Sequence, residues 1–190
     1  ILGSGNSLTI GYEENTERNM ILYEFSNPHI FNSQIATKLY YADTSDGRDM
    51  LVDISHPFYS LETPWAAGFS TQDETLEEPI RHMDEEINSF RHQTMYNEVY
   101  FGVATDIQST HTQRWLAGMT NEEDNFFATK DTLQNIPTDR KAVYPWIEYQ
   151  YLENSYGVFK NVNQIQRPED IALGQNLSFR LGFAGTQFDN

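Results

Sequence analysis

Acidic residues and histidines gather in one stretch of the sequence, between positions 77 and 92. It opens with Glu77-Glu78 and ends at His92, and the candidates between them are His82, Asp84, Glu85 and Glu86. Carboxylates and imidazoles are ligands of divalent cations, but this spacing matches neither an EF-hand nor a zinc motif. The expected structure is therefore a solvated acidic loop, and we predict no metal site and no cofactor.

Three further histidines, His29, His56 and His111, fall in short predicted turns. Histidine titrates closest to neutral pH, so the three side chains could form a pH-sensitive cluster at one end of the molecule. Polar residues are also common in turns for purely local reasons. Both interpretations stay open at the level of the sequence.

Motifs of the common enzyme classes are absent from the sequence. It contains no Gly-x-Ser-x-Gly motif, so nothing indicates a serine hydrolase, and it contains no cysteine that could act as a nucleophile. Gly3-Ser-Gly5 is not followed by the helix that a phosphate-binding loop requires. We therefore expect no enzymatic activity.

The charge of the chain is strongly negative, with a formal net charge of −16 from 28 acidic and 12 basic residues. Such a field repels phosphate backbones, and we predict no binding to nucleic acid. Aromatic residues make up 14% of the chain, and bulky rings of this kind are typical of β-sheets and of membrane interfaces.

A repeated turn defines the expected fold. Phe25-Ser-Asn-Pro28-His-Ile-Phe31 and Ile54-Ser-His-Pro57-Phe-Tyr59 place the same Ser-x-Pro corner twice between strand-like runs. Strand pairs that follow one another without helices form meanders, and long meanders usually close into barrels. We predict an all-β fold in one domain over residues 1–190: an antiparallel up-and-down meander of about ten strands, which is part of, or closes into, a transmembrane β-barrel.

Alternation along the strands predicts an apolar face and a polar face. In a barrel the apolar set would face lipid and the polar set would face a hydrated lumen, where opposite charges can pair. The predicted lipid-facing residues are Val99, Phe101, Val103, Leu177, Phe179, Leu181 and Phe183. The predicted lumen-facing residues are Glu98, Asp106, Arg114, Glu148 and Arg180.

The connections between strands differ in predicted length at the two ends of the sheet. Long charged loops are expected at 72–92, 121–140 and 162–170, all at one end, and short turns at the other. This asymmetry is typical of outer-membrane barrels, whose periplasmic turns are short. The predicted periplasmic turns contain Asn27, Pro28, His56 and Pro57.

A sheet with one apolar face has a second interpretation. It could pack that face on a core, in a soluble acidic β-sandwich or β-sheet binding domain of the cell envelope. Alternation alone does not separate the two, because a lipid-facing and a core-facing surface have the same pattern.

Several of these turn and strand segments resemble the bacterial surface antigen family, which comprises outer-membrane barrel insertases and two-partner secretion translocators. The segments are Asn27-Pro28-His-Ile-Phe31, Tyr41-Ala-Asp-Thr-Ser-Asp-Gly47, His56-Pro57-Phe58-Tyr59-Ser-Leu-Glu-Thr-Pro-Trp65 and Tyr144-Pro-Trp-Ile-Glu-Tyr149. The resemblance implies a location in the bacterial outer membrane and a role in inserting or secreting proteins.

The implied partners are outer-membrane lipid and, through the parent protein, client polypeptides. Family barrels have more strands than the ten or so expected here, so the resemblance implies a part of such a barrel. Its open edges would expose unpaired backbone groups, and they could pair edge to edge in an oligomer.

Overall fold

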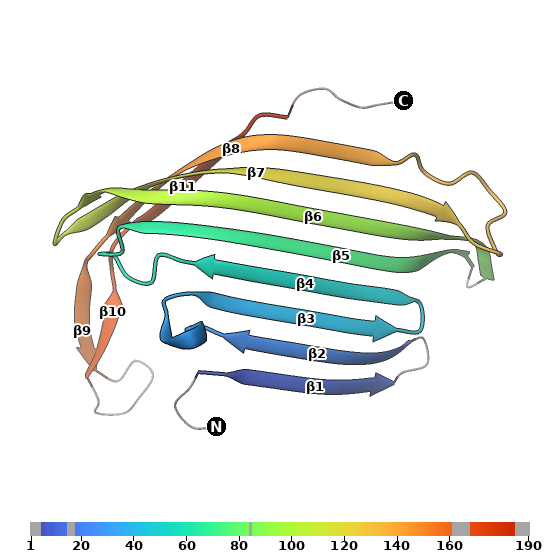
Figure 1. Ribbon diagram of the computed structural model, residues 1–190, viewed down its shortest axis with the longest axis horizontal. Helices are drawn as coiled ribbons and strands as arrows, with labels where there is room; N and C mark the ends of the chain where they lie inside the picture. Colours follow the sequence, from blue (N-terminus) through green and yellow to red (C-terminus); the bar gives the residue numbers. More distant parts are fainter. Residues whose placement is uncertain (1–4, 15–17, 84, 161–167, 185–190) are drawn as a thin grey trace.

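The computed structural model describes residues 5–14, 18–83, 85–160 and 168–184 of the chain. They form a nine-stranded antiparallel sheet in the order β1-β2-β3-β4-β5-β6-β7-β8-β11, and a separate two-stranded sheet of β9 and β10 (Figure 1). The strands of the large sheet are β1 (Ser7–Glu14), β2 (Asn19–Asn27), β3 (Ala36–Thr44), β4 (Gly47–His56), β5 (Trp65–His82), β6 (Glu85–Ile107), β7 (His111–Ala128), β8 (Arg140–Glu153) and β11 (Asn176–Gly182).

The all-β antiparallel meander predicted from the sequence is confirmed. Each strand from β1 to β7 pairs with the next strand along the chain. The predicted β3–β4 hairpin also forms, with a tight turn at Ser45-Asp46 between the paired residues Thr44 and Gly47. Neither Asp46 nor Gly47 has the positive φ expected of an Asp-Gly turn. The described sheet is open rather than closed into a barrel, since β1 and β11 form its two edges.

The end of the meander differs from the prediction. A strand was expected between β8 and the last strand, but β9 (Tyr156–Lys160) instead pairs with β10 (Pro168–Ala172). This hairpin projects from the large sheet (Figure 1), and β11 takes the place beside β8. The strand exists as the alternation indicates, but its partner is set by a contact that a local pattern does not contain.

The predicted long loops at 72–92 and 121–140 are wrong in large part. β5 and β6 continue pairing almost to their turn, from Trp65 opposite Val103 to His82 opposite Glu85. β7 likewise runs on to Ala128 before an irregular connection at 129–139. The charged segments are therefore strand extensions, held by the backbone ladder of an antiparallel sheet.

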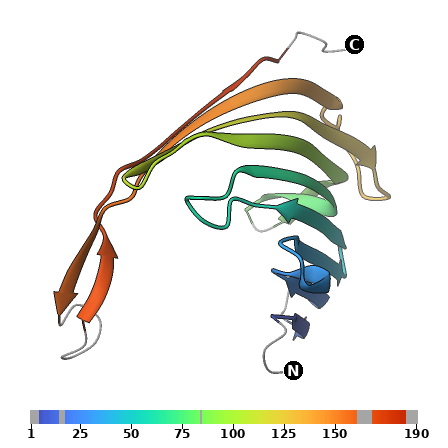
Figure 2. The same ribbon diagram turned by 60° about the vertical axis from the view of Figure 1, so that its left-hand side comes forward.

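The large sheet is strongly arched (Figure 2). The connection between β4 and β5, residues 57–64, reaches into the hollow side of the arch, where the carbonyls of Ser60 and Leu61 accept hydrogen bonds from Arg114 and Thr112. The face that carries these two side chains is therefore the concave face, and every second residue of each strand lies on the convex face.

Glycines give the concave face room for large rings. A Cβ on Gly118 would lie 2.4 Å from the ring of Trp146, and one on Gly68 would lie 2.4 Å from the ring of Tyr100. Trp146 and Tyr100 are the directly opposite residues on the neighbouring strands. Each ring covers the bare backbone of a glycine, a pairing that also suits a curved sheet.

Helical structure is minor in the described ranges. It consists there of a 3-10 turn at Ile30–Asn32, within the β2–β3 connection. No helix in these ranges combines the length and the apolar character needed to cross a membrane.

Candidate functional site

An apolar belt crosses the convex face from one edge of the sheet to the other. Directly opposite residues on neighbouring strands share a face, and the register therefore defines the rows of the belt. One row joins Trp65, Val103, Trp115, Tyr149 and Phe179 across five strands. The next rows continue it with Ala67, Phe101, Ala117, Ile147 and Leu181, and with Ile54, Phe69, Val99, Met119 and Pro145.

The belt includes the predicted apolar residues. Five of them lie in these rows: Val99, Phe101, Val103, Phe179 and Leu181. Leu177 lies opposite Tyr151, next to the row of Tyr149 and Phe179. Phe183 follows the end of β11, where its N–H donates to the carbonyl of Pro145 at 3.0 Å. These side chains are exposed, with Phe101 at 56% and Phe179 at 61%.

The belt runs diagonally across the strands. In β1 it is centred on Ile10, and the register leads from Ile10 through each neighbouring strand to Lys141 of β8. In β8, however, the belt runs from Val143 to Tyr151 and is centred on Ile147, six residues beyond Lys141. An offset of six residues over seven strand-to-strand steps means that the strands are tilted by roughly 30° from the perpendicular to the belt.

Beyond the belt the convex face becomes polar. Thr71 donates to Asn97 at 2.7 Å, Gln93 to Asp73 at 2.9 Å, and Lys141 forms an ion pair with a neighbouring glutamate. Of these residues, Asp73 and the partner of Lys141, Glu123, lie in segments that the sequence predicted to be loops. The apolar belt therefore occupies only part of the length of β5, β6 and β7.

The concave face holds a polar cluster built from four strands. Arg180 of β11 pairs with Glu148 of β8 at 2.6 Å and with Glu98 of β6 at 3.2 Å. Its guanidinium also lies 3.8 Å from the ring centroid of Trp146. Trp146 donates through Nε1 to Thr120 of β7 at 3.0 Å, and Thr120 in turn donates to Glu98 at 3.1 Å.

Four of the five residues predicted to face the lumen lie on one face of the sheet, and the fifth lies on the other. Glu98, Arg114, Glu148 and Arg180 all lie on the concave face, where Glu148 is 7% exposed. Asp106 does not join them, because an irregularity in the register after Ala104 places it opposite Gln113. A β-bulge of this kind moves the following side chain to the other face.

Asp106 has its own small network near the β6–β7 turn. It accepts hydrogen bonds from Gln108 at 2.8 Å and from His111 at 3.0 Å. These hydrogen bonds, together with the charge of His111, hold the pKa of the Asp106 carboxyl below its ordinary value.

The predicted histidine cluster is only partly assembled. His29 and His56 both contact the ring of Tyr59, with centroid distances of 5.4 and 5.8 Å. The Tyr59 hydroxyl donates to the carbonyls of Pro28 and Gln34, which ties the two repeated turns together. His111 instead bonds Asp106 on another part of the sheet.

The predicted turn residues lie at one end of the sheet. Asn27 ends β2 and His56 ends β4, and Pro28 and Pro57 follow them in the two repeated connections. Asn27 also accepts from the backbone N–H of His29 at 2.6 Å, which closes a local turn.

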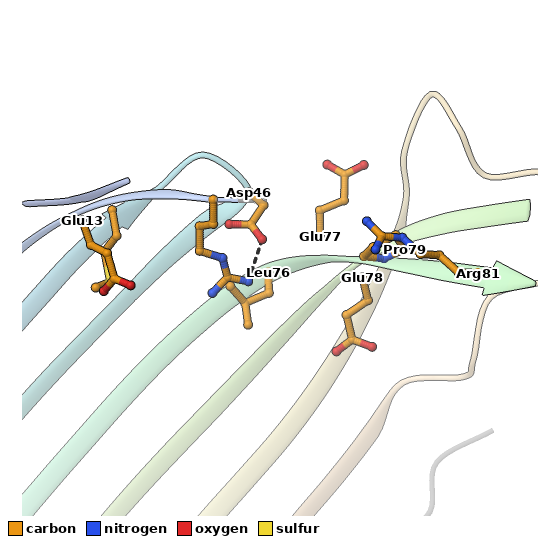
Figure 3. A pocket seen from close by; sticks show the side chains of 9 residues that line it. Glu13, Asp46, Leu76, Glu77, Glu78, Pro79 and Arg81 are labelled. Carbon is orange, nitrogen blue, oxygen red and sulfur yellow. Dashed lines mark hydrogen bonds and ion pairs between the residues drawn. The ribbon is translucent and has the colours of Figure 1, made fainter. Parts of the chain in front are cut away.

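Two of the acidic candidates, Glu77 and Glu78, lie at the opposite end and line a hollow of 690 Å³ (Figure 3). Glu77 and Glu78 both belong to β5 and point in opposite directions, as neighbours on a strand must (Figure 3). Arg18 pairs with Asp46 at 2.6 Å beside them. The side chains of His82, Asp84, Glu85 and Glu86 lie outside the described part, and the described residues hold no group of three or more candidate metal ligands.

His92 bridges two carboxylates at this end. Its Nδ1 lies 3.0 Å from Glu78 of β5 and its Nε2 lies 2.9 Å from Asp124 of β7. Burial disfavours the charged imidazole, but the hydrogen bonds and negative charges of the two carboxylates outweigh it and raise the pKa of His92. The ring also stacks on Phe126 at 4.5 Å.

The comparisons with known proteins give no assignment. No protein-family model matches the chain, and no curated protein matches it.

Proposed function

We propose that this chain forms part of the wall of a bacterial outer-membrane β-barrel. The belt on the convex face lies against lipid, and the concave face borders a hydrated interior. The main support for this proposal is that the distribution of side chains is the reverse of that in a soluble protein. Rings such as Phe101 are exposed on the convex face, while Arg114 and Glu148 are buried on the concave face. An apolar exterior and a polar interior are the arrangement of membrane barrels.

The area of the molecule supports the same proposal. The chain exposes 13505 Å², whereas a compact monomer of 22.0 kDa exposes about 9,300 Å². The excess reflects an open sheet, and the exposed rings of its convex face, such as Phe101 and Phe179, show that apolar surface contributes to it. Contiguous apolar patches of this extent mark an interface with a membrane or with another protein.

The diagonal course of the belt favours lipid over a protein cover. A bilayer requires the apolar band to be level with the membrane plane while the strands are tilted. With the belt level in the membrane, the offset between Ile10 and Ile147 tilts the strands by roughly 30° from the membrane normal. This is close to the tilt of about 35–45° in membrane barrels. Trp65 and Trp115 lie at one margin of the belt, where interfacial aromatic residues belong.

We infer the finer role from the resemblance of the repeated turns to the surface antigen family. In this role the parent protein inserts or secretes polypeptides across the outer membrane, without catalytic chemistry of its own. The unpaired edges β1 and β11 then pair with other strands of the closed barrel or with a second copy of the chain.

The three tryptophans test the membrane assignment. Trp65 and Trp115 are on the convex face, and Trp146 is on the concave face. Single-tryptophan variants, with the other two changed to Phe, are incorporated into vesicles that contain phosphatidylcholine brominated on its acyl chains. We expect strong quenching of Trp65 and Trp115 and weak quenching of Trp146.

Equal, weak quenching of all three would instead favour the acidic β-sheet domain of the cell envelope, with a protein covering the convex face. The insertion role has a separate test: vesicles that carry the chain should accelerate the folding of a urea-unfolded outer-membrane barrel relative to empty vesicles. If Trp65 and Trp115 are quenched but the folding of the barrel protein is not accelerated, the chain is part of a membrane barrel but does not insert proteins.

A further inference from the structure

A small hollow lies on the concave face, beneath the connection between β4 and β5. Its volume is 320 Å³, at the lower end of the range of ligand pockets. Rings and aliphatic groups form most of its wall, with Phe58 from the connection and Tyr100, Leu116 and Trp146 from the sheet. The polar side chains of the wall include two arginines, Arg114 and Arg180.

The two arginines differ in their partners. Arg180 is held by two carboxylates, those of Glu98 and Glu148. Arg114 is 5% exposed and forms no ion pair within the described residues. Its Nη2 donates to the carbonyl of Ser60 at 2.7 Å, but its buried Nε has no hydrogen-bond partner. The ring of Phe58 lies over the Arg114 guanidinium at 4.3 Å and offsets part of its burial, but a buried guanidinium without a counter-charge is still costly.

The remaining hydrogen-bonding capacity of the hollow selects an anion. Both oxygens of Glu148 are already occupied, Oε1 by Gln150 and Ser178 and Oε2 by Arg180. The donor without a partner is the Nε–H of Arg114, and a carboxylate can accept from Nε and Nη2 together through the forked geometry of the guanidinium. The surrounding rings favour a ligand whose other end is apolar.

We propose that this hollow binds a small organic carboxylate, with Arg114 as its ion-pair partner and the rings of Phe58, Tyr100 and Trp146 around its apolar part. A molecule the size of benzoate suits the volume. This binding site does not depend on whether the convex face meets lipid or protein, because it is built entirely on the concave face.

The test is titration calorimetry of the purified full chain in a sugar-headgroup detergent, with three probes. Benzoate should bind saturably, with a Kd on the order of 1 mM for so few atoms. Benzyl alcohol, which lacks the charge, and inorganic phosphate, which lacks the apolar part, should each bind at least tenfold more weakly. Equal binding of benzyl alcohol or of phosphate would overturn the proposal, as would the absence of saturable benzoate binding.

Substitutions of Arg114 distinguish a role in ligand binding from a role in holding the β4–β5 connection. Arg114→Gln should abolish benzoate binding, and Arg114→Lys, which keeps the charge but loses the fork, should weaken it about tenfold. Arg140→Gln, an exposed arginine at the start of β8, is the matched control and should leave the Kd unchanged. Unchanged binding in Arg114→Lys and in a folded Arg114→Gln would contradict the proposal.

Discussion

The two faces of the sheet differ in what holds them together. The buried apolar side chains of the described residues are few: Ala42, Ala66, Phe90, Leu116 and Trp146. The convex face instead exposes its rings, and the concave face buries charges that are paired or hydrogen-bonded. This contrast teaches that the described residues bury little apolar surface among themselves, although such burial is the dominant favourable term in folding. Under the proposed function, lipid against the convex face supplies the missing burial.

The polar cluster around Arg180 on the concave face, in contrast, depends on hydrogen bonds and ion pairs. It joins β6, β7, β8 and β11 through Arg180, Thr120 and two glutamates. Buried polar networks stabilise a structure when each member has a partner, and they become costly when one partner is removed. The two faces should therefore respond to opposite kinds of substitution.

The largest expected effect is on the convex face, at Ala117. This residue is exposed and lies in the central row of the belt, so Ala117→Arg removes almost no packing. At the middle of a bilayer the new charge should cost about 2–4 kcal/mol. The measurement is the free energy of unfolding in urea, with the protein in lipid vesicles.

Asn125→Arg is the matched control for this substitution. Asn125 lies on the same strand and the same face, eight residues further along, beyond the belt. There the change should cost less than about 1 kcal/mol. If both variants lower the free energy of unfolding by the same small amount, the convex face does not contact lipid.

A smaller effect is expected on the concave face, at Arg180. Arg180→Gln keeps most of the side chain but leaves Glu148, which is 7% exposed, without its cation. The cost should be about 1–3 kcal/mol, the penalty of a buried group that loses its partner. It is measured by the same unfolding titration.

The exposed pair of Arg48 with Asp73 provides the comparison for Arg180. Its atoms are 3.7 Å apart and the Arg48 side chain is 58% exposed. Arg48→Gln should change stability by less than about 1 kcal/mol. Similar losses for the two variants would mean that the concave cluster is as open to water as the surface.

Much of the fold could be predicted from period-two alternation and turn residues. Alternation places Val99 and Phe101 on one face and Glu98 on the other without knowledge of any partner strand. The hairpin signal at Ser45-Asp46-Gly47 is likewise local, and the hairpin forms there, although without a positive φ. The same alternation places Glu148 and Arg180 on one face, but their direct contact depends on β11 lying beside β8.

The errors have physical causes that a local pattern does not record. The segment 72–92 is polar on both faces, so it has the composition of a loop, yet cross-strand pairs and the backbone ladder hold it as strand. The bulge that follows Ala104 moves Asp106 to the opposite face, and no residue type announces it. The hollow beside Arg114 needs the β4–β5 connection, whose position is set by tertiary contacts.

The smallest expected effect concerns His92, which lies in the extended part of the strands beyond the belt. Its substitution tests whether this residue stabilises the strand extension. A neutral imidazole can donate to only one of Glu78 and Asp124, whereas the protonated ring can donate to both. The pKa of His92 is raised in the folded state above the ordinary value of 6.5. The bridge therefore stabilises the protein fully below that ordinary pKa, and this contribution is lost as the pH rises through the higher, folded-state pKa.

We expect wild type to exceed His92→Gln in unfolding free energy by up to about 1 kcal/mol near pH 5.5, and by clearly less near pH 8.5. Comparing the two proteins at each pH cancels the titration of the other histidines, which both contain. High salt should reduce the difference at the lower pH, because the bridge is partly exposed. A difference that is constant or grows with pH would mean that His92 stabilises the extension by its stacking on Phe126, and not by joining β5 to β7 through charge.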